Sequence, residues 1–329
     1  MRGVPLSQTS LADRLMSMSV QTADPAGRRA AFEQHRGRLW GVAYRMLGSR
    51  ADADDMVQEA YLRWHGAAAN DDVRAPQAWL VTTTTRLCID RLRQRRAERD
   101  AYVGPWLPEP LVEEEPAADA ATELASDLSV AFLALLERLA PEERAAFLLH
   151  DVFEADYAEI AVALDKSEDA CRQIVSRARR RVRDERPRAQ VSRAARERLV
   201  DAFIRAVELR DRDALVALFA NEATLTSDGG GKAKAAHKVV RGGPSVARFL
   251  LGVLRPAGAQ LELRRITVNR EPGVALFFAG RLFSVVSLHT DGTQIFGVYS
   301  VLNPEKLRHV KVADLPPHEP SDSRSHSSG

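Results

Sequence analysis

Residues 45–99 decide the fold of the amino-terminal part, and they read RMLGSRADADDMVQEAYLRWHGAAANDDVRAPQAWLVTTTTRLCIDRLRQRRAER. Three aspartates crowd the start of the first half, where negative charge favours the amino end of a helix. The apolar residues that follow recur at helical spacing: Met56, Val57, Ala60, Tyr61 and Trp64. The second half is predicted to be an apolar helix from Pro76 to about Arg96. An acidic helix for protein docking thus precedes a helix that ends in basic side chains.

The basic end of the second helix suits phosphate oxygens, because a guanidinium group donates two parallel hydrogen bonds. Trp64 and Trp79 flank the loop between the helices. Aromatic side chains beside a basic surface suit the binding of unpaired bases, which stack on the rings. The run 82–85 is all threonine, is unfavourable in a helix and suggests a polar surface. Each observation has an alternative. The arginines could form only a solvated helix end, both tryptophans could lie in the core, and the threonines could belong to a helix that is simply packed. The basic residues are Arg86, Arg91, Arg93, Arg95, Arg96 and Arg99.

The composition fits a globular chain of two or three domains, with 329 residues, 45% of them hydrophobic and 28% charged. The net charge is only +2, so affinity for nucleic acid must come from local arginine clusters. The 2 cysteines, Cys88 and Cys171, give no disulfide framework and no zinc spacing, which suits a reducing cytoplasm. No apolar run is long enough to span a bilayer. Residues 1–27 lack a signal peptide's apolar core and are predicted to be a flexible leader.

Helical spacing predicts a first helix over residues 28–47 that stops at Gly48, which completes an all-α domain over residues 28–100. Residues 101–121 are rich in proline and glutamate, and we interpret them as a linker with an apolar anchor at Trp106.

A second all-α domain is predicted over residues 122–187. One helix is expected over 122–139, and Pro141 restarts another. A short helix at 157–164, a turn at 165–167 and a longer helix at 168–183 then form a helix-turn-helix.

The longer helix of this motif is the candidate DNA-reading element. Polar side chains fill its first turns, where a recognition helix touches base edges in the major groove. Later arginines would reach phosphates. The alternative is a plain charged helix. The candidates are Ser167, Glu168, Asp169, Arg172, Gln173, Ser176, Arg177 and Arg180.

The pattern changes to α+β over residues 191–315, where two helices precede a series of strands. We expect helices packed on one face of a curved antiparallel sheet. Turns are predicted at 271–273 and 291–292, a further helix at 245–254, and a disordered tail at 316–329. The helices before the strands are expected at 194–209 and 213–219. The strands are expected at 223–226, 239–241, 261–269, 274–278, 283–288, 294–302 and 307–312.

The α+β domain offers weak chemical signals. Residues 228–232 read DGGGK, but the spacing is wrong for a phosphate loop, so a glycine hairpin or mobile loop is the better interpretation. Glu222, Asp228 and His237 would form an acid/base set if they lined a cavity. The sequence contains no convincing catalytic triad or metal triad, so no cofactor is expected.

Residues 32–183 resemble the extracytoplasmic-function sigma factors. The stretch DADDMVQE at 52–59 is similar to the family's region 2 core, and LAPEER at 139–144 with YAEIA at 157–161 is similar to region 4. The resemblance implies that Asp52, Asp55, Gln58 and Glu59 bind core RNA polymerase. It implies contact with the −10 element by Asn70, Asp71, Trp79, Thr83, Arg86, Arg91 and Arg93. It implies contact with the −35 element by Ser167, Glu168, Arg172, Gln173, Ser176, Arg177 and Arg180.

Residues 191–315 resemble the SnoaL-like, ketosteroid-isomerase-like cone. WLPEPL at 106–111, DGGGK at 228–232 and NPEKL at 303–307 are similar to signatures of the actinobacterial SigJ-type subgroup. In that subgroup the extension is taken to regulate the sigma part in cis. The regulatory candidates are Trp106, Asp228, Gly229, Gly230, Gly231, Lys232, Asn303 and Pro304. The isomerases' catalytic acid and tyrosine have no match, so catalysis by the cone is not expected.

The sequence therefore predicts a cytoplasmic sigma factor with a fused regulatory cone, monomeric when free and not an enzyme. Its expected partners are core RNA polymerase, promoter DNA and a small-molecule ligand in the cone, but no membrane. We expect residues 229–231 and 303–307 to contact the sigma domains or the linker at Trp106. The alternative is a helix-turn-helix regulator fused to a small-molecule enzyme or ligand-binding cone.

Overall fold

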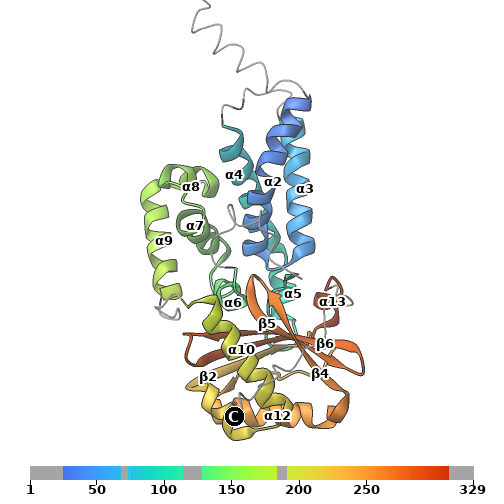
Figure 1. Cartoon of the computed structure of the whole chain (residues 1–329). Helices are drawn as coiled ribbons and strands as arrows, with labels where there is room; N and C mark the ends of the chain where they lie inside the picture. Colours follow the sequence, from blue (N-terminus) through green and yellow to red (C-terminus); the bar gives the residue numbers. More distant parts are fainter. Residues whose placement is uncertain (1–24, 68–72, 74, 114–127, 184–190, 311–329) are drawn as a thin grey trace, which may run out of the picture. The chain divides into compact units, whose positions relative to one another are not determined.

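The computed structural model describes residues 25–67, 73, 75–113, 128–183 and 191–310 (Figure 1). The chain divides into two compact units. The first unit holds residues 1–94 and 139–179, and the second holds residues 95–138 and 180–329. The predicted leader up to residue 24, the expected start of a helix at 122 and the expected tail lie outside the described residues.

The first unit begins with three helices, α2 (Pro25–Leu47), α3 (Arg50–Ala67) and α4 (Pro76–Gln94), which confirms the predicted helices. Their shared core consists of Phe32, Leu39, Val57, Trp64 and Leu80. Gly48 has a φ of 63° and its amide donates to the Tyr44 carbonyl at 2.8 Å, so it ends α2 as a left-handed cap. The first helix starts at Pro25, earlier than the predicted residue 28.

The same unit contains α7 (Pro141–Asp151), α8 (Tyr157–Leu164) and, up to residue 179, α9 (Glu168–Arg183). These helices confirm the predicted helix-turn-helix. Asp156 caps α8 by accepting from the Glu159 amide at 2.8 Å, and Asp165 turns the chain with a φ of 55°. The core of the motif consists of Ala146, Leu149, Ile160, Ala163, Cys171, Ile174 and Val175.

The second unit is built on one sheet with the strand order β1-β4-β5-β6-β7-β2-β3. The strands are β1 (Val112–Glu113), β2 (Phe219–Asp228), β3 (Val240–Arg241), β4 (Leu261–Val268), β5 (Glu271–Phe278), β6 (Arg281–Thr290) and β7 (Ile295–Val301). Strands β2 and β7 pair in parallel, so the expectation of a purely antiparallel sheet is wrong at this pair. The parallel pair is possible because the whole β3–β6 segment, which includes α12, connects β2 to β7 along the chain.

Both faces of this sheet are covered, whereas helices were expected on one face only. Helices α10 (Arg193–Glu208), α11 (Arg212–Leu218) and α12 (Gly243–Leu254) pack on one face; Figure 1 shows α10 and α12 there. The linker and α6 (Val130–Leu136) pack on the other. In β5, Val274 and Leu276 face the first layer, while Ala275 and Phe277 face the second. The apolar run of β5 is the sequence signal of a strand buried on both sides.

The linker is part of the sheet, because β1 pairs antiparallel with β4. Asn269 fixes it there: its side chain accepts from the Leu111 amide at 2.9 Å, and its amide donates to the Leu111 carbonyl at 2.7 Å. Asn269 and Arg270, with φ values of 50° and 69°, form the two-residue turn between β4 and β5. The turn predicted at 271–273 is therefore wrong, since these residues lie in β5.

Three short elements complete the second unit: α5 (Arg96–Asp100), a 3₁₀ helix (Arg255–Gln260) and α13 (Pro304–Leu307). The strand expected over 307–312 is wrong over its described residues, because α13 ends there and a turn follows. Helix α6 groups with the sheet rather than with the helix-turn-helix, although it was expected in residues 122–187. None of the described helices is long and apolar enough to cross a membrane.

Candidate functional sites

A groove of about 510 Å³ lies between α3 and α4 in the first unit. Its lining carries three carboxylates, from Asp55, Glu59 and Asp90, the amide of Gln58 and the exposed apolar side chain of Leu62. It also carries two guanidinium groups, from Arg63, which pairs with Glu59 at 3.0 Å, and Arg91, which pairs with Asp52. Three of the four predicted polymerase-binding residues thus share one concave surface. The fourth, Asp52, is buried and accepts two hydrogen bonds from Arg91, at 3.1 and 3.2 Å. This pair joins α3 to α4.

Two of the predicted −10 residues on α4, Arg86 and Arg93, contact α7 and α8 of the same unit. Arg86 donates to the carbonyls of Val162 and Ala163, at 2.5 and 3.1 Å, and so caps the carboxyl end of α8. Arg93 pairs with Glu142 at 2.7 Å and with Asp90 at 3.3 Å. Trp79 and Thr83 are partly buried, and the predicted contacts Asn70 and Asp71 lie outside the described residues.

Two of the sequence alternatives are resolved by burial. Trp64 is 1% exposed and its indole donates to the Arg28 carbonyl at 3.1 Å, which confirms the core alternative for this tryptophan. Thr84 and Thr85 are fully buried, so the expected polar surface is wrong for these two residues. Their hydroxyls have no hydrogen-bond partner among the described residues.

Replacing Arg86 by alanine is expected to loosen α8 from α4, because two carbonyls of the last turn lose a charged donor. We expect a loss of about 1–2 kcal/mol in the free energy of unfolding of the first unit. Urea denaturation and hydrogen exchange of the α8 amides measure it. Arg36→Ala is the control, since Arg36 makes only an exposed pair with Glu33 at 3.6 Å. Equal unfolding midpoints for the two variants would contradict the capping role.

The predicted −35 residues Gln173, Ser176, Arg177 and Arg180 on α9, and Ser167 just before it, are exposed. The hydroxyl of Ser167 also accepts from the Ala170 amide at 3.2 Å, so it caps the helix.

Another predicted −35 residue, Arg172, is held locally. It pairs with Glu168 at 2.9 Å and with Asp169 at 2.7 Å, and lies over the Tyr157 ring. Within the described part of the chain, Arg177 is exposed and has no hydrogen bond or ion pair, so its guanidinium is available to a ligand.

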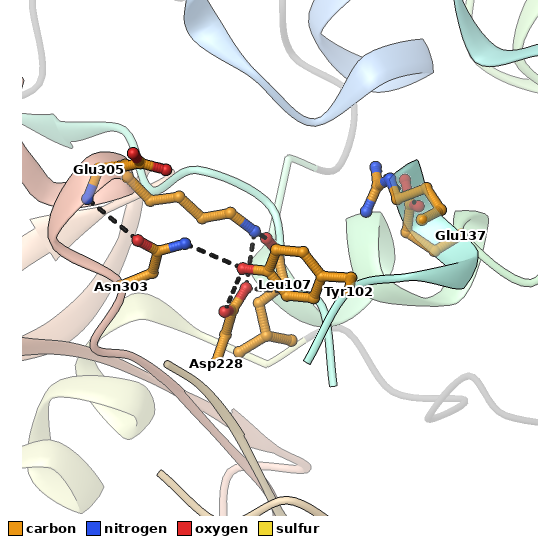
Figure 2. A network of polar contacts seen from close by, with 8 residues as sticks. Tyr102, Leu107, Glu137, Asp228, Asn303 and Glu305 are labelled. Carbon is orange, nitrogen blue, oxygen red and sulfur yellow. Dashed lines mark hydrogen bonds and ion pairs between the residues drawn. The ribbon is translucent and has the colours of Figure 1, made fainter. Parts of the chain in front are cut away.

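In the second unit, the linker is held by the buried carboxylate of Asp228 (Figure 2). This carboxylate accepts from the Tyr102 hydroxyl at 2.6 Å, the Leu107 amide at 2.8 Å and the Lys306 ammonium at 2.6 Å. Lys306 also donates to the Leu107 carbonyl at 2.5 Å. We call these four residues the linker clamp. Both polar backbone groups of Leu107 are satisfied by residues more than a hundred positions away.

Asn303 supports the clamp from the end of β7. Its side chain donates to the Tyr102 hydroxyl at 2.9 Å and accepts from the Glu305 amide at 3.0 Å, which caps α13 ahead of Pro304. Gly230, with a φ of 56°, lies so close that a Cβ there would clash with the Asn303 amide. Lys232 pairs with Glu305 across the same turn.

Trp106 lies between two cations. The Arg99 guanidinium is 3.2 Å from the centre of its ring, and the Lys306 ammonium is 4.0 Å away. Arg99 in turn pairs with Glu137 at 3.1 Å. The ring thus shields Lys306 from water and ties α5 to the clamp.

Burial shifts the titration of the clamp. It lowers the pKa of Lys306 to about 8, although Asp228 opposes this effect. Burial, with the hydrogen bond to Asp228, raises the pKa of Tyr102. Both shifts come chiefly from loss of water around the side chains.

Raising the pH from 7 to 9 is therefore expected to strengthen linker docking. When the linker lifts off, Lys306 regains water and its pKa returns toward 10.5, so the undocked form binds more protons in this window. The charges of Asp228 and Glu137 oppose the lowering of the Lys306 pKa, and the charge of Arg99 reinforces it. Ionisation of Tyr102 would weaken docking only above its ordinary pKa of about 10. Hydrogen exchange at Leu107, corrected for intrinsic rate, measures it. Lys306→Met should abolish the trend, and weaker protection at pH 9 in the parent protein would contradict it.

The structure brings together most of the predicted regulatory residues: Trp106, Asp228, Gly230, Lys232, Asn303 and Pro304, with Gly229 and Gly231 in the adjoining loop. Sequence reasoning missed Tyr102, Lys306 and Asn269, although Lys306 lies within the quoted NPEKL stretch. The suggested acid/base set is not assembled. Glu222 and His237 are exposed, and Asp228 faces the linker rather than a cavity.

Residues 31–98 match the family model described as Sigma-70 region 2, and residues 129–182 match Sigma-70, region 4. The chain is 42% identical over 235 residues to the ECF RNA polymerase sigma factor SigJ of Mycobacterium tuberculosis, covering 70% of this chain and 74% of the relative. It is 32% identical over 286 residues to the probable ECF RNA polymerase sigma factor SigI of Mycobacterium tuberculosis, covering 84% and 94%.

The crystal structure of Mycobacterium tuberculosis extracytoplasmic function sigma factor SigJ aligns with a TM-score of 0.69 at 35% identity, covering 85% of this chain and 98% of that chain. The similarity extends through both units. It favours the sigma-factor prediction over the fused-enzyme alternative.

Proposed function

Because the chain belongs to the extracytoplasmic function family of RNA polymerase sigma factors, we propose that its carboxy-terminal unit regulates promoter use in cis by holding the linker. A sigma factor is a non-catalytic subunit that binds core RNA polymerase and promoter DNA to direct initiation. The observation that carries the proposal is the linker clamp, in which Asp228 and Lys306 hold the backbone of Leu107.

The clamp matters because it acts on the segment between the two DNA-binding modules. That segment, residues 95–138, has about 44 residues, and fully extended it would reach about 150 Å. The −10 and −35 elements are separated by roughly 85 Å of B-DNA, at about 3.4 Å per base pair. When residues 101–113 and α6 are docked on the sheet, the segment can no longer extend to this length. Release of the linker would restore its ability to span the two promoter elements.

Contacts inside the first unit point the same way. Arg86 and Arg93, proposed to hold the −10 strand, are occupied by the α8 carbonyls and by Glu142. Arg144, 3% exposed, donates to the Met46 carbonyl at 2.6 Å and joins α7 to α2. The DNA-free protein thus holds its two modules against each other, and promoter DNA must compete for the same arginines.

We place core polymerase on the groove between α3 and α4. The carboxylates of Asp55 and Asp90, beside the exposed Leu62, suit a basic, partly apolar partner. Asp55 and Glu59 would make the charge contacts. Asp52 would act indirectly, by holding Arg91 and so the relative position of the two helices.

Run-off transcription with purified core polymerase tests the proposed regulation. The full chain and Asp228→Asn should both start at a cognate promoter, but in different amounts. Asp201→Asn is the matched control, because Asp201 makes only a surface pair with Arg265 at 3.3 Å. Equal transcript levels for all three proteins would refute regulation through the clamp.

Replacing Arg177 by alanine is expected to weaken binding to the −35 element by about 1–3 kcal/mol if the side chain reads a base. Arg172→Ala should cost less, because its guanidinium must first leave Glu168 and Asp169. Fluorescence anisotropy on −35 duplexes at two salt concentrations measures both. A loss equal on all sequences would make Arg177 a phosphate contact instead.

We also propose a small-molecule ligand for the cone. The second unit contains a cavity with a cluster of hydroxyl groups at one end, and a ligand there would give the clamp a signal to respond to.

A further inference from the structure

Residues 229–261 of the second unit contain six lysines and arginines and no aspartate or glutamate. The whole chain carries a net charge of only +2, so positive charge is concentrated in this segment. The segment covers the loop after β2, strand β3, helix α12 and the 3₁₀ helix (Figure 1). A positive segment without acids suits a polyanionic partner.

Five of these six side chains are exposed and, among the residues that the structure describes, make no hydrogen bond or ion pair. The sixth, Lys232, pairs with Glu305. Elsewhere in this unit an exposed arginine finds an acid, as Arg265 on β4 does with Asp201 at 3.3 Å. We call the five unpaired side chains the basic face: Lys234, Lys238, Arg241, Arg248 and Arg255.

Helix α12 presents two of these arginines on one side. Its buried residues Val246, Ala247 and Leu254 belong to the core of the unit, and the exposed side carries Arg248 and Arg255. These two arginines are seven residues apart, which is two helical turns and about 10 Å along the axis. The phosphates of about three base pairs cover this distance in B-DNA.

Two further cations flank this helix. Arg241 lies on β3, which leads directly into α12, and Lys234 lines the same cavity as Val253 near the end of the helix. The start of α12 is held close to β2, because the Gly242 amide donates to the Ala223 carbonyl at 2.8 Å. The basic face therefore has a fixed direction on the sheet.

Acids on the adjoining elements do not neutralise the basic face in the part of the chain that the structure describes. Asp213 on α11 pairs with Arg212 at 3.9 Å, and Glu222 on β2 is exposed and makes no ion pair. Like charges that are held together repel one another, and the binding of a polyanion relieves this repulsion. A phosphate backbone is therefore a complementary partner for the basic face.

The chain itself brings this unit to duplex DNA. Helix α9 ends at Arg183 and α10 begins at Arg193, so the ten residue steps between them span at most about 35 Å. When region 4 binds the −35 element through α9, the start of α10 stays within this distance of the duplex. A short tether gives an effective concentration in the millimolar range, so even a weak phosphate contact becomes occupied.

We propose that the basic face binds the phosphate backbone of the duplex DNA that flanks the −35 element. The contact carries no sequence information, because phosphates are the same at every base pair. It adds affinity to the base contacts made by region 4. This inference rests on the proposed function, since the tether matters only when region 4 binds DNA.

The test compares two duplexes, each with the full chain. The short duplex ends at the −35 element, and the long duplex adds ten base pairs of arbitrary sequence on each side, about 34 Å. Fluorescence anisotropy should show that the parent protein binds the long duplex more tightly. Arg248→Ala with Arg255→Ala should lose about 8-fold of this advantage at 0.1 M salt for each phosphate contact removed. The slope of log K against log salt should fall by about 0.9 per contact.

The matched control is Arg198→Ala with Arg205→Ala, which removes the same charge from α10. These arginines are also exposed, seven residues apart and without an ion pair among the described residues. On α10, however, they alternate with the acids Asp201 and Glu208. The control pair should keep the long-duplex advantage. Equal losses in the two double variants would show an effect of net charge and would overturn the proposed surface.

Two further results decide the nature of the contact. Arg248→Lys with Arg255→Lys should keep most of the advantage, because a lysine also binds phosphate as a point charge. An unchanged advantage in the alanine variant would overturn the inference. So would a loss of affinity for core polymerase, measured by surface plasmon resonance, without any loss on DNA, since the face would then bind an acidic protein surface.

Arg177→Ala separates this inference from the proposed function. Arg177 lies on α9, outside the basic face, so its loss should weaken binding to the short and the long duplex by the same factor. If Arg177→Ala weakens both and the basic-face variant weakens neither, only the inference fails. If Arg177→Ala weakens neither, the proposed reading of the −35 element fails, and the tether argument fails with it.

Discussion

Replacing Asp228 by asparagine is expected to release the linker and to lower the free energy of unfolding of the second unit by about 3–5 kcal/mol. The carboxylate is fully buried and accepts from three donors. An amide has one acceptor oxygen in its place, so the Lys306 ammonium loses its counter-charge inside the protein. Urea denaturation measures the stability, and hydrogen exchange at Leu107 measures the release.

A double variant separates the ion pair from the rest of the clamp. Lys306→Met removes the uncompensated ammonium, so Asp228→Asn with Lys306→Met should be more stable than Asp228→Asn alone. Asp201→Asn should leave both readouts unchanged. An Asp228→Asn protein with parental stability and a protected Leu107 amide would show that the clamp contributes nothing to docking.

Replacing Asp55 by arginine is expected to reduce affinity for core RNA polymerase about 100-fold or more. Asp55 is exposed in the groove between α3 and α4. A cation there would repel a basic partner and would be buried on binding, which typically costs about 2–5 kcal/mol. Surface plasmon resonance with core polymerase measures the affinity.

The matched control for this charge reversal is Glu33→Arg. Glu33 lies on α2, outside the groove, and makes only an exposed pair with Arg36. It should bind core polymerase as the parent chain does. If both variants lose affinity equally, the loss reflects net charge; if neither does, the groove is not the docking surface.

The helices of the first unit could be predicted because local signals agree. Negative charge starts α3, Pro76 starts α4, and Gly48 ends α2 in the left-handed conformation that glycine accommodates best. The helix-turn-helix follows from its caps and apolar stripe. Such signals act within a few residues, so they can be recognised in the sequence without knowledge of tertiary contacts.

The fate of the linker could not be predicted in the same way. Its proline content indicates only that it is not helical, and its partners Asp228 and Asn269 lie 121 and 158 residues away from Leu107 and Leu111. The sequence offered two partial signals: residues 229–231 and 303–307 were expected to contact the sigma domains or the linker at Trp106, and the uninterrupted apolar run of β5 requires a cover on both faces. Neither the position of that cover nor its identity is written near β5.

Side-chain roles on α4 were equally hard to assign. A guanidinium that would suit a phosphate also suits a helix carboxyl end or a glutamate, and Arg86 and Arg93 have these partners. The amino-acid sequence shows the same arginine whether its partner is a phosphate, a helix carboxyl end or a glutamate. Only a fold that brings α8 and Glu142 to α4 distinguishes them.

The pairing of β1 with β4 constrains how this protein can be rearranged across generations. A chain that ends at residue 187 would expose Leu107, Val112 and Val130, because the strands that cover them lie after that residue. A chain that begins after residue 187 would keep those strands but would lose β1 from the edge of the sheet. Neither half is thus an interchangeable cassette. Recombination that swaps the carboxy-terminal half must carry the matching linker with it, so linker and sheet should be exchanged between lineages as a single heritable block.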